Sequence, residues 1–329
     1  MERRHFLAAM AAPLGAQGPD RMRIAFLGGA HPHTPAKTAL VRDSPRWELA
    51  GIAEEDGAVR EQYGKTGVPL LSREQILRDA SIRVVAVGSA VKDHAGDARQ
   101  ALEAGKHLHL EKPPATSMKE YRGLADLARR KGLLMQMGYM WRYNPAINAA
   151  LELARKGWLG EIHTVRGMVD IAVDAEARRA LALFEGGVMF EMGCHLIDPT
   201  VRLLGRPTAV RPVLRTDNTV AVLEYPRALA VIGSSALRPN APRQRSFEVL
   251  GTNGSAVVRP IEPPALELDL AKAAGPYAAG RNIVKMPLYR RYVDDFTELE
   301  QAVRLGKPLS VTPAEDLLVQ ETLLRACGM

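Results

Sequence analysis

The sequence is poor in the residues that mark cross-linked, metal-bound or membrane-spanning proteins. Its 329 residues include only 2 cysteines, Cys194 and Cys327, which form neither a disulfide framework nor a metal-binding spacing. No apolar run reaches about 18 residues, so no transmembrane helix and no membrane partner are expected. Aromatic residues make up only 5%, and the basic residues do not cluster into runs. Nucleic-acid binding is therefore not expected, although the net charge of +7 would suit the phosphates of a dinucleotide.

The first 20 residues differ in kind from the rest of the chain. Arg3 and Arg4 are followed by a small, apolar run over residues 8–16, which resembles a twin-arginine export signal. This pattern predicts a signal segment over residues 1–20 and export to the periplasm. A disordered start accounts for the same residues, and the protein would then be cytoplasmic.

Residues 21–141 alternate short apolar runs with amphipathic segments. This alternation predicts an α/β domain with a doubly wound parallel sheet of the Rossmann type. The strands are expected at 22–27, 47–53, 84–87, 107–110 and 133–137, and the helices at 34–42, 73–79, 94–104 and 118–131.

Residues 142–329 follow a different pattern, in which turn residues join most of the strands. They predict an α+β domain with a mainly antiparallel sheet, which binds substrate and supplies the surface for a homo-oligomer. The strands are expected at 162–173, 210–214, 219–225, 228–234, 246–251 and 254–258, and the helices at 146–156, 193–204, 289–305 and 313–327.

Two distant segments carry groups that can do chemistry on an alcohol. Glu111, Lys112 and Pro113 follow a short apolar strand, at the end of a parallel sheet where ligands bind. In the second segment a helix would place Glu191 and His195 on one face, one turn apart. Oxidising an alcohol needs a base for the hydroxyl proton and a cation for the developing alkoxide. We assign His195 as the base and Lys112 as the electrostatic partner, with Glu191 as a third catalytic residue that holds His195, binds substrate or repositions the reacting carbon.

The expected dinucleotide turn departs from the usual glycine pattern. Three glycines spaced G-x-G-x-x-G bring the pyrophosphate close to a helix N-terminus. Here the three positions are Gly28, Ala30 and His33, with His31 between them as a possible phosphate contact. Either these residues still bind a dinucleotide or the turn has lost that affinity. Glu54, at the end of the second strand, would bind the ribose hydroxyls and favour NAD over NADP, although a solvated acidic turn would look the same.

Four segments in the same order resemble the Gfo/Idh/MocA family of nicotinamide-dependent oxidoreductases, from about residue 22 to residue 320. The matching segments are Leu108–Pro113; Gly138, Tyr139, Arg142, Tyr143 and Pro145; Gly157–Ile162; and Glu191–Asp198. The resemblance implies an NAD-binding Rossmann domain, a small carbohydrate-like substrate and a catalytic role for Lys112. This chain departs from the family by carrying Glu191 where an aspartate is usual.

The resemblance and the strand ends together define the expected site. The cofactor-binding residues are expected to be Gly28, Ala30, His31, His33, Glu54, Gly88, His94, Glu111, Lys112 and Pro113. His94 lies either near the nicotinamide or at a helix cap. Arg142 and Tyr143 bind substrate or organise the hinge, and Asp198 binds substrate, orients His195 or caps a helix.

No metal is expected. His31, His33, His107 and His109 are the candidate zinc ligands, but His107 and His109 alternate along one strand, and no helical pair of histidines accompanies them.

The function predicted from the sequence is NAD-dependent oxidation of a sugar, cyclitol or polyol. A first alternative is an enzyme of the same fold that retains and recycles its NAD during glycoside cleavage, elimination or epimerisation. A second alternative is a non-catalytic sensor of dinucleotide or sugar, which the altered glycine turn favours and the presence of Lys112 and His195 disfavours.

Overall fold

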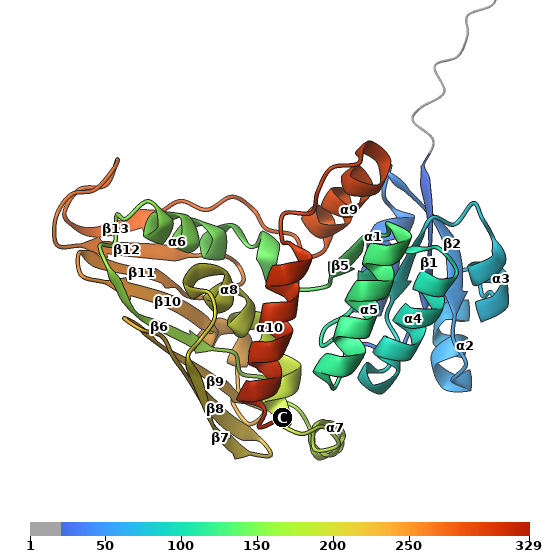
Figure 1. The fold of residues 1–329 in the computed structure, drawn as a ribbon, viewed down its shortest axis with the longest axis horizontal. Coiled ribbons are helices and arrows are strands. Elements are labelled where there is room, and N and C mark those ends of the chain that lie inside the picture. Colours follow the sequence, from blue (N-terminus) through green and yellow to red (C-terminus); the bar gives the residue numbers. More distant parts are fainter. Residues whose placement is uncertain (1–20) are drawn as a thin grey trace, which may run out of the picture.

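A computed structural model describes residues 21–329, which form two units, each built on one sheet (Figure 1). The predicted signal segment, residues 1–20, lies outside the described residues. Within residues 21–329 no helix is both long and apolar enough to span a bilayer.

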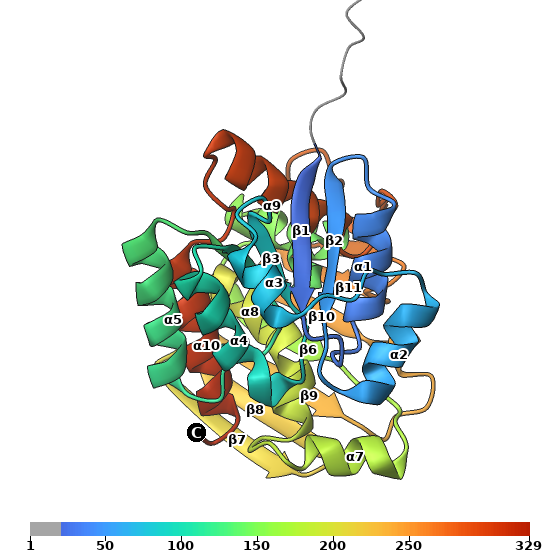
Figure 2. The ribbon, with the colours of Figure 1, turned by 90° about the vertical axis from the view of Figure 1, so that its right-hand side faces the viewer.

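The first sheet has five parallel strands in the order β2-β1-β3-β4-β5. They are β1 (Met22–Leu27), β2 (Trp47–Ala53), β3 (Val84–Val87), β4 (His107–Leu110) and β5 (Met135–Met137). β1 and β3 are apolar and nearly fully buried because helices cover both faces of the sheet. Helix α1 (Thr34–Arg42) lies on one side, and α4 (His94–Glu103) and α5 (Met118–Lys131) lie on the other (Figure 2). The strand order reverses between β1 and β3, so a ligand crevice is expected beyond their carboxyl ends.

The second sheet has eight strands in the order β13-β12-β11-β10-β6-β9-β8-β7. They are β6 (Ile162–Met168), β7 (Ala209–Arg215), β8 (Asn218–Glu224), β9 (Leu229–Ser235), β10 (Ser246–Gly251), β11 (Gly254–Val258), β12 (Leu266–Leu270) and β13 (Gly280–Val284). All neighbouring pairs are antiparallel except β6 with β9. The predicted α/β fold with a second, mainly antiparallel sheet is confirmed.

Three helices pack on the second sheet, and a fourth reaches back to the first unit. Helices α6 (Pro145–Arg155), α8 (Cys194–Leu204) and α10 (Pro313–Ala326) contact strands of the second sheet. Helix α9 (Val293–Leu305) instead brings Phe296 within 4.6 Å of the His109 ring and 6.1 Å of the Trp47 ring, measured between centroids. The two units therefore share a packed interface that includes α9. On the second sheet Val213 and Ile283 are exposed, and assembly through this sheet stays a prediction.

Several elements differ from the sequence-based prediction. The strand expected to continue to Val173 ends at Met168 in β6, and the helix expected from Tyr289 begins at Val293. Tyr292 takes a left-handed conformation with φ of 69°, which separates α9 from the preceding segment. Four elements were missed: α2 (Gly57–Lys65), α7 (Ala175–Leu181), β12 and β13. The remaining short helix, α3 (Arg73–Arg78), lies where a helix was expected.

Candidate active site

A cavity of about 540 Å³ lies where the carboxyl ends of β1 and β4 face the second unit. Its lining includes His31 and His33 from the turn after β1, Lys112 from the turn after β4, and Glu191 and His195 from the second unit. The fold thus brings together five residues predicted from three distant segments of the sequence. Their placement at one cavity provides a cation, a carboxylate and imidazoles within reach of one small molecule.

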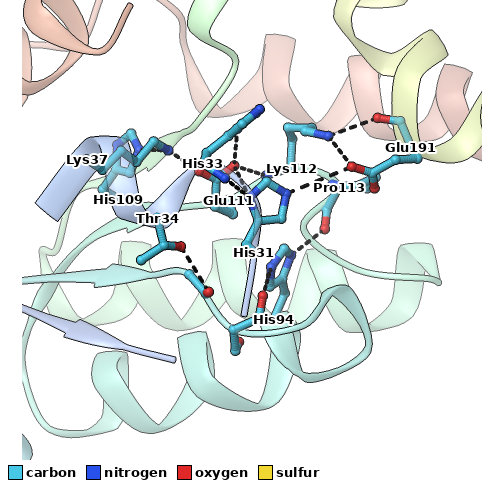
Figure 3. Close-up of polar contacts among 12 residues, drawn as sticks. His31, His33, Thr34, Lys37, His94, His109, Glu111, Lys112, Pro113 and Glu191 are labelled. Carbon is cyan, nitrogen blue, oxygen red and sulfur yellow. Dashed lines mark hydrogen bonds and ion pairs between the residues drawn. The ribbon is translucent and has the colours of Figure 1, made fainter. Parts of the chain in front are cut away.

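Lys112 is held by Glu191 across the junction of the two units (Figure 3). Its Nζ donates to Glu191 Oε1 at 2.6 Å and to the Glu191 carbonyl at 3.0 Å. Burial lowers the pKa of Lys112, but Glu191, together with Cys194 and Glu111, outweighs burial and holds this pKa above its ordinary value. Lys112 is therefore a fixed cation and not a base at neutral pH.

The segment that carries Glu191 is wound differently from the predicted regular helix. Residues Met189–Gly193 form a π-helical turn that leads directly into α8. Such turns leave backbone groups free, and they are frequent at functional sites. Here the Glu191 carbonyl accepts the bond from Lys112 while both Glu191 and His195 line the cavity.

His195 is buried and uncharged at neutral pH. Its ring lies 5.0 Å from the Trp141 ring, and its Nδ1 has no hydrogen-bond partner among the described residues. Burial lowers the pKa of His195 well below its ordinary value, and the positive charge of Lys112 lowers it further. A neutral imidazole facing the cavity can accept a proton. Glu191 is bonded to Lys112 and not to His195.

Glu111 lies at the centre of a second polar cluster (Figure 3). Its Oε1 bonds Lys37 Nζ, and its Oε2 accepts from the Lys112 amide at 3.2 Å and contacts His33 Nδ1 at 3.3 Å. Burial raises the pKa of Glu111, but His31, Lys37 and His33 outweigh it and keep the carboxyl ionised. Glu111 thus helps to position two residues that line the cavity, His33 and Lys112.

The candidate zinc ligands are divided between two places. Potential ligand atoms of His31, His33 and Glu111 lie within 4.8 Å of one another. Both Glu111 oxygens are nevertheless already bonded, and Lys37 adds a cation that disfavours a metal ion there. His107 and His109 do not join this cluster: His107 accepts from the Leu134 amide, and His109 bonds Lys37 and Gln136.

A second cavity of about 520 Å³ lies beside β2 and shares Ala30 and Ala90 with the first. Gly28 lines it with a φ of 75°, and a Cβ there would lie 2.3 Å from the Ser89 Cα. The Ala30 amide has no acceptor among the described residues, so one donor of the altered turn stays available to a phosphate. Because the cavities adjoin at Ala30, they form one groove that a dinucleotide can span.

Glu54 stands at the far end of this groove. Its Oε2 accepts from the Gly29 amide at 2.6 Å, and its Oε1 accepts from the amides of Glu55 and Asp56 at 2.8 and 2.9 Å. These bonds fix the carboxylate at the carboxyl end of β2. Together Glu54, Glu55 and Asp56 place negative charge on this part of the groove.

His94 and Gly88 help to hold the turns after β3 and β4 in place. The His94 ring lies between the carbonyls of Pro113 and Ser89, at 2.8 and 3.0 Å, and so ties the turn after β4 to the turn after β3 (Figure 3). It is fully buried, and the start of α4 has no side-chain cap. At Gly88 an added Cβ would lie 2.3 Å from Thr34 Oγ1, so only glycine lets β3 approach α1 this closely.

Arg142, Tyr143 and Asp198 do not line the catalytic cavity. Arg142 Nε and Nη2 donate to Asp198 Oδ1 at 2.9 and 2.7 Å, and Nη2 also bonds Asp316. The Tyr143 hydroxyl bonds Glu298. Asp198 therefore does not orient His195, and these contacts favour the structural alternative for Arg142 and Tyr143.

Two lining residues, Arg245 and Arg291, were not found from the sequence. Both lie in the second unit, far along the chain from Lys112 and His195. Neither belongs to a recognisable motif, and only tertiary packing, such as that of Arg245 over the Trp141 ring, brings them to the cavity. Apolar residues on and beside α7 complete the wall: Ile171, Val173, Ala177, Ala180, Leu181 and Phe184.

Known proteins share both units of this fold. A crystal structure of GenD2 from gentamicin A biosynthesis, in complex with NAD, superposes with a TM-score of 0.79 at 24% identity, covering 97% of both chains. UDP-N-acetylglucosamine 3-dehydrogenase GnnA from Acidithiobacillus ferrooxidans gives 0.75 at 18% identity, covering 93% of this chain and 96% of the other. In sequence, a dTDP-3,4-didehydro-2,6-dideoxy-alpha-D-glucose 3-reductase from Streptomyces violaceoruber is 27% identical over 255 residues, or 74% of this chain and 70% of the relative.

Family sequence models match most of the described chain. The oxidoreductase family model with an NAD-binding Rossmann fold matches residues 22–139, and the GFO/IDH/MocA C-terminal domain model matches residues 147–257. With both models matching in order, on the two units that enclose the groove, the chain belongs to the Gfo/Idh/MocA family of oxidoreductases.

Proposed function

We propose that this protein oxidises a secondary alcohol of a sugar, cyclitol or polyol, or reduces the matching ketone, with NAD as its cofactor. The observation that carries the proposal is the groove that runs from Glu54 past Ala30 to Lys112 and His195. It joins a cofactor-sized space to a cavity that holds a neutral imidazole and a fixed cation. The sugar-derived compounds in the names of the similar proteins support the choice of substrate class.

NAD is favoured over NADP by the charges at the ribose end of the groove. Glu54, Glu55 and Asp56 line it, and a carboxylate repels a 2′-phosphate while accepting bonds from ribose hydroxyls. Gly28 and the unbonded Ala30 amide supply the close approach and the donor that a pyrophosphate needs.

Three side chains divide the chemistry of the alcohol. NAD, when bound, supplies the acceptor for the hydride that leaves the alcohol carbon. His195 accepts the hydroxyl proton, because its pKa is lowered and the ring is neutral at neutral pH. Lys112 stabilises the oxygen as it becomes negative, and Glu191 keeps Lys112 charged and in place.

The test separates binding from turnover in one set of variants. We expect Lys112→Ala and His195→Ala to bind NADH within about threefold of the wild type, a difference below 1 kcal/mol. We expect both to oxidise polyols about 100- to 10,000-fold more slowly. His163→Ala, on the exposed part of β6, is the control and should match the wild type. A wild-type protein that binds no nicotinamide dinucleotide would contradict the proposal and favour the sensor alternative.

Denaturing the purified full chain distinguishes the two enzymatic alternatives. An ordinary dehydrogenase exchanges its cofactor and should release little NAD per chain. Release of nearly one NAD or NADH per chain would instead favour the enzyme that retains and recycles its cofactor.

A further inference from the structure

The wall of the catalytic cavity that comes from the second unit carries two arginines, Arg245 and Arg291. Arg245 follows the short 3-10 helix Ala241–Gln244 and directly precedes β10. It is only 9% exposed, and its Nε donates to the Asp170 carbonyl at 3.0 Å. The guanidinium is therefore fixed in place at the cavity wall.

The two arginines differ in their partners. Arg291 forms a two-pronged ion pair with Glu262, with Nε at 2.6 Å from Oε1 and Nη2 on Oε2. The terminal nitrogens of Arg245 bond no acceptor among the described residues. The nearest carboxylates are occupied elsewhere, because Asp170 bonds the Ser235 amide and Arg238 while Glu262 bonds Arg291. Arg245 is therefore a largely buried cation with two free donor nitrogens, Nη1 and Nη2.

The charge balance of the cavity also leaves Arg245 without an anionic partner. Lys112, Arg245 and Arg291 are the strong cations of its described lining, and Glu191 is the one carboxylate. Glu191 neutralises Lys112, and Glu262 neutralises Arg291. A cation with free donors at the cavity wall favours an anionic group of the ligand, so Arg245 offers an anion a binding position inside the substrate cavity. Burial and the charge of Arg291 lower the pKa of Arg245.

Arg245 also lies beside the reacting groups. Its guanidinium carbon stands 5.9 Å from the centre of the Trp141 ring, whose other neighbour, at 5.0 Å, is His195. A substrate alcohol at His195 and Lys112 would thus place its neighbouring carbons in front of Arg245. The residues between Ile171 and Phe184 that line the cavity are all apolar, so they offer no competing charge.

We propose that the substrate is an acidic sugar or polyol whose carboxylate or phosphate oxygens bind the two terminal nitrogens of Arg245. A planar guanidinium suits both groups, since each presents two oxygens at the matching spacing. The inference rests on the proposed function and deepens it by naming the substrate class.

The experiment compares charged sugars with their neutral partners on the NADH-loaded protein, where an alcohol binds without being oxidised. NADH binding is measured first by calorimetry. Glucose, glucuronate and glucose 6-phosphate are then titrated, followed by galactose and galacturonate. We expect at least one charged sugar to bind about tenfold or more tightly than its neutral partner. Preference for the uronates would identify a carboxylate, and preference for the phosphate a phosphate ester.

Variants test whether Arg245 causes this preference. Arg245→Gln should abolish it, and Arg245→Lys should retain part of it because the charge remains while the fork is lost. Arg243→Gln removes the same charge from an exposed position two residues away and should leave the preference intact. Equal binding of charged and neutral sugars by the wild type overturns the inference, as does a preference that persists in Arg245→Gln. Failure of NADH to bind would instead contradict the proposed function, and the same sugar titrations without NADH would still test Arg245.

Discussion

Nζ of Lys112 lies 2.6 Å from Oε1 of Glu191, and this ion pair joins the two units of the chain at the catalytic cavity. Lys112 follows β4 of the first sheet, whereas Glu191 lies in the π-helical turn before α8. The carbonyl of Glu191 binds the same Nζ, so the position of the cation depends on the second unit. In the proposed reaction the substrate oxygen meets a charge that both units hold in place.

Replacing Glu191 by glutamine tests this dependence. The substitution keeps the size of the side chain but removes the charge that raises the pKa of Lys112. We expect kcat to fall about tenfold or more, which corresponds to about 1.4 kcal/mol of lost transition-state stabilisation. NADH binding should not change. Glu185→Gln, at an exposed position before the π-helical turn, is the control, and an unchanged kcat in Glu191→Gln would refute the positioning role.

The lowered pKa of His195 sets the direction of the pH dependence. The neutral ring is the active form, so kcat/KM should stay level near neutral pH and fall only at a pH well below the ordinary histidine pKa of 6.5. His195→Gln should lose this acidic limb in a pH–rate profile. His163→Gln should retain it. An acidic limb that lies above pH 7 in the wild type would mean that another group is the base.

Gly28 and Gly67 offer a matched pair for testing the altered dinucleotide turn. Their φ angles are 75° and 74°, but an added Cβ meets the Ser89 backbone at Gly28 and meets nothing within 4 Å at Gly67. Gly67→Ala should cost about 1–2 kcal/mol of unfolding free energy, from the left-handed backbone alone. Gly28→Ala should cost more and also weaken NADH binding. Urea unfolding measures the loss of stability, and calorimetry measures NADH binding. Equal losses of unfolding free energy in the two variants would show that the loop after β3 moves to make room for the methyl group added at position 28.

Local patterns in the sequence were sufficient to predict the two-sheet architecture and most of its elements. Buried parallel strands such as β1 and β3 are short apolar runs. Helix α5 is indicated by its amphipathic period, its Ser117 cap and Gly132 at its end. Helix α2 was missed because its apolar positions are few, although Asp56 at its cap was a usable signal. The start of α9 was misplaced because nothing in the local sequence requires Tyr292 to be left-handed.

The site was predictable where its residues belong to motifs and unpredictable where only packing places them. Lys112, Glu191 and His195 meet at one cavity because the carboxyl ends of parallel strands face α8. Asp198 lies on the same helix as His195, yet Arg142 draws it into a separate buried network. Arg245 reaches the cavity through long-range contacts that no spacing along the chain encodes.

Glu54 should set the choice between NAD and NADP. Glu54→Ser removes the carboxylate that would repel a 2′-phosphate and that accepts the Gly29 amide. We expect the ratio of the Kd for NADPH to the Kd for NADH to fall about tenfold, or about 1.4 kcal/mol. Glu74→Ser, on the exposed side of α3, should leave the ratio unchanged. A ratio that Glu54→Ser does not alter would assign discrimination to other groups in the groove.

Arg142 distinguishes a structural role from a substrate-binding role at the junction of the two units. Its guanidinium neutralises the buried carboxylates of Asp198 and Asp316, and burial has already raised the pKa of Asp316 to about 6 despite that partner. Arg142→Met would leave two buried acids without a cation, so unfolding free energy should fall by about 3–5 kcal/mol. Arg122→Met, an exposed change on α5, should cost less than about 1 kcal/mol. Chemical denaturation measures both. A stable Arg142→Met protein whose KM for the alcohol rises sharply would instead place Arg142 in contact with substrate.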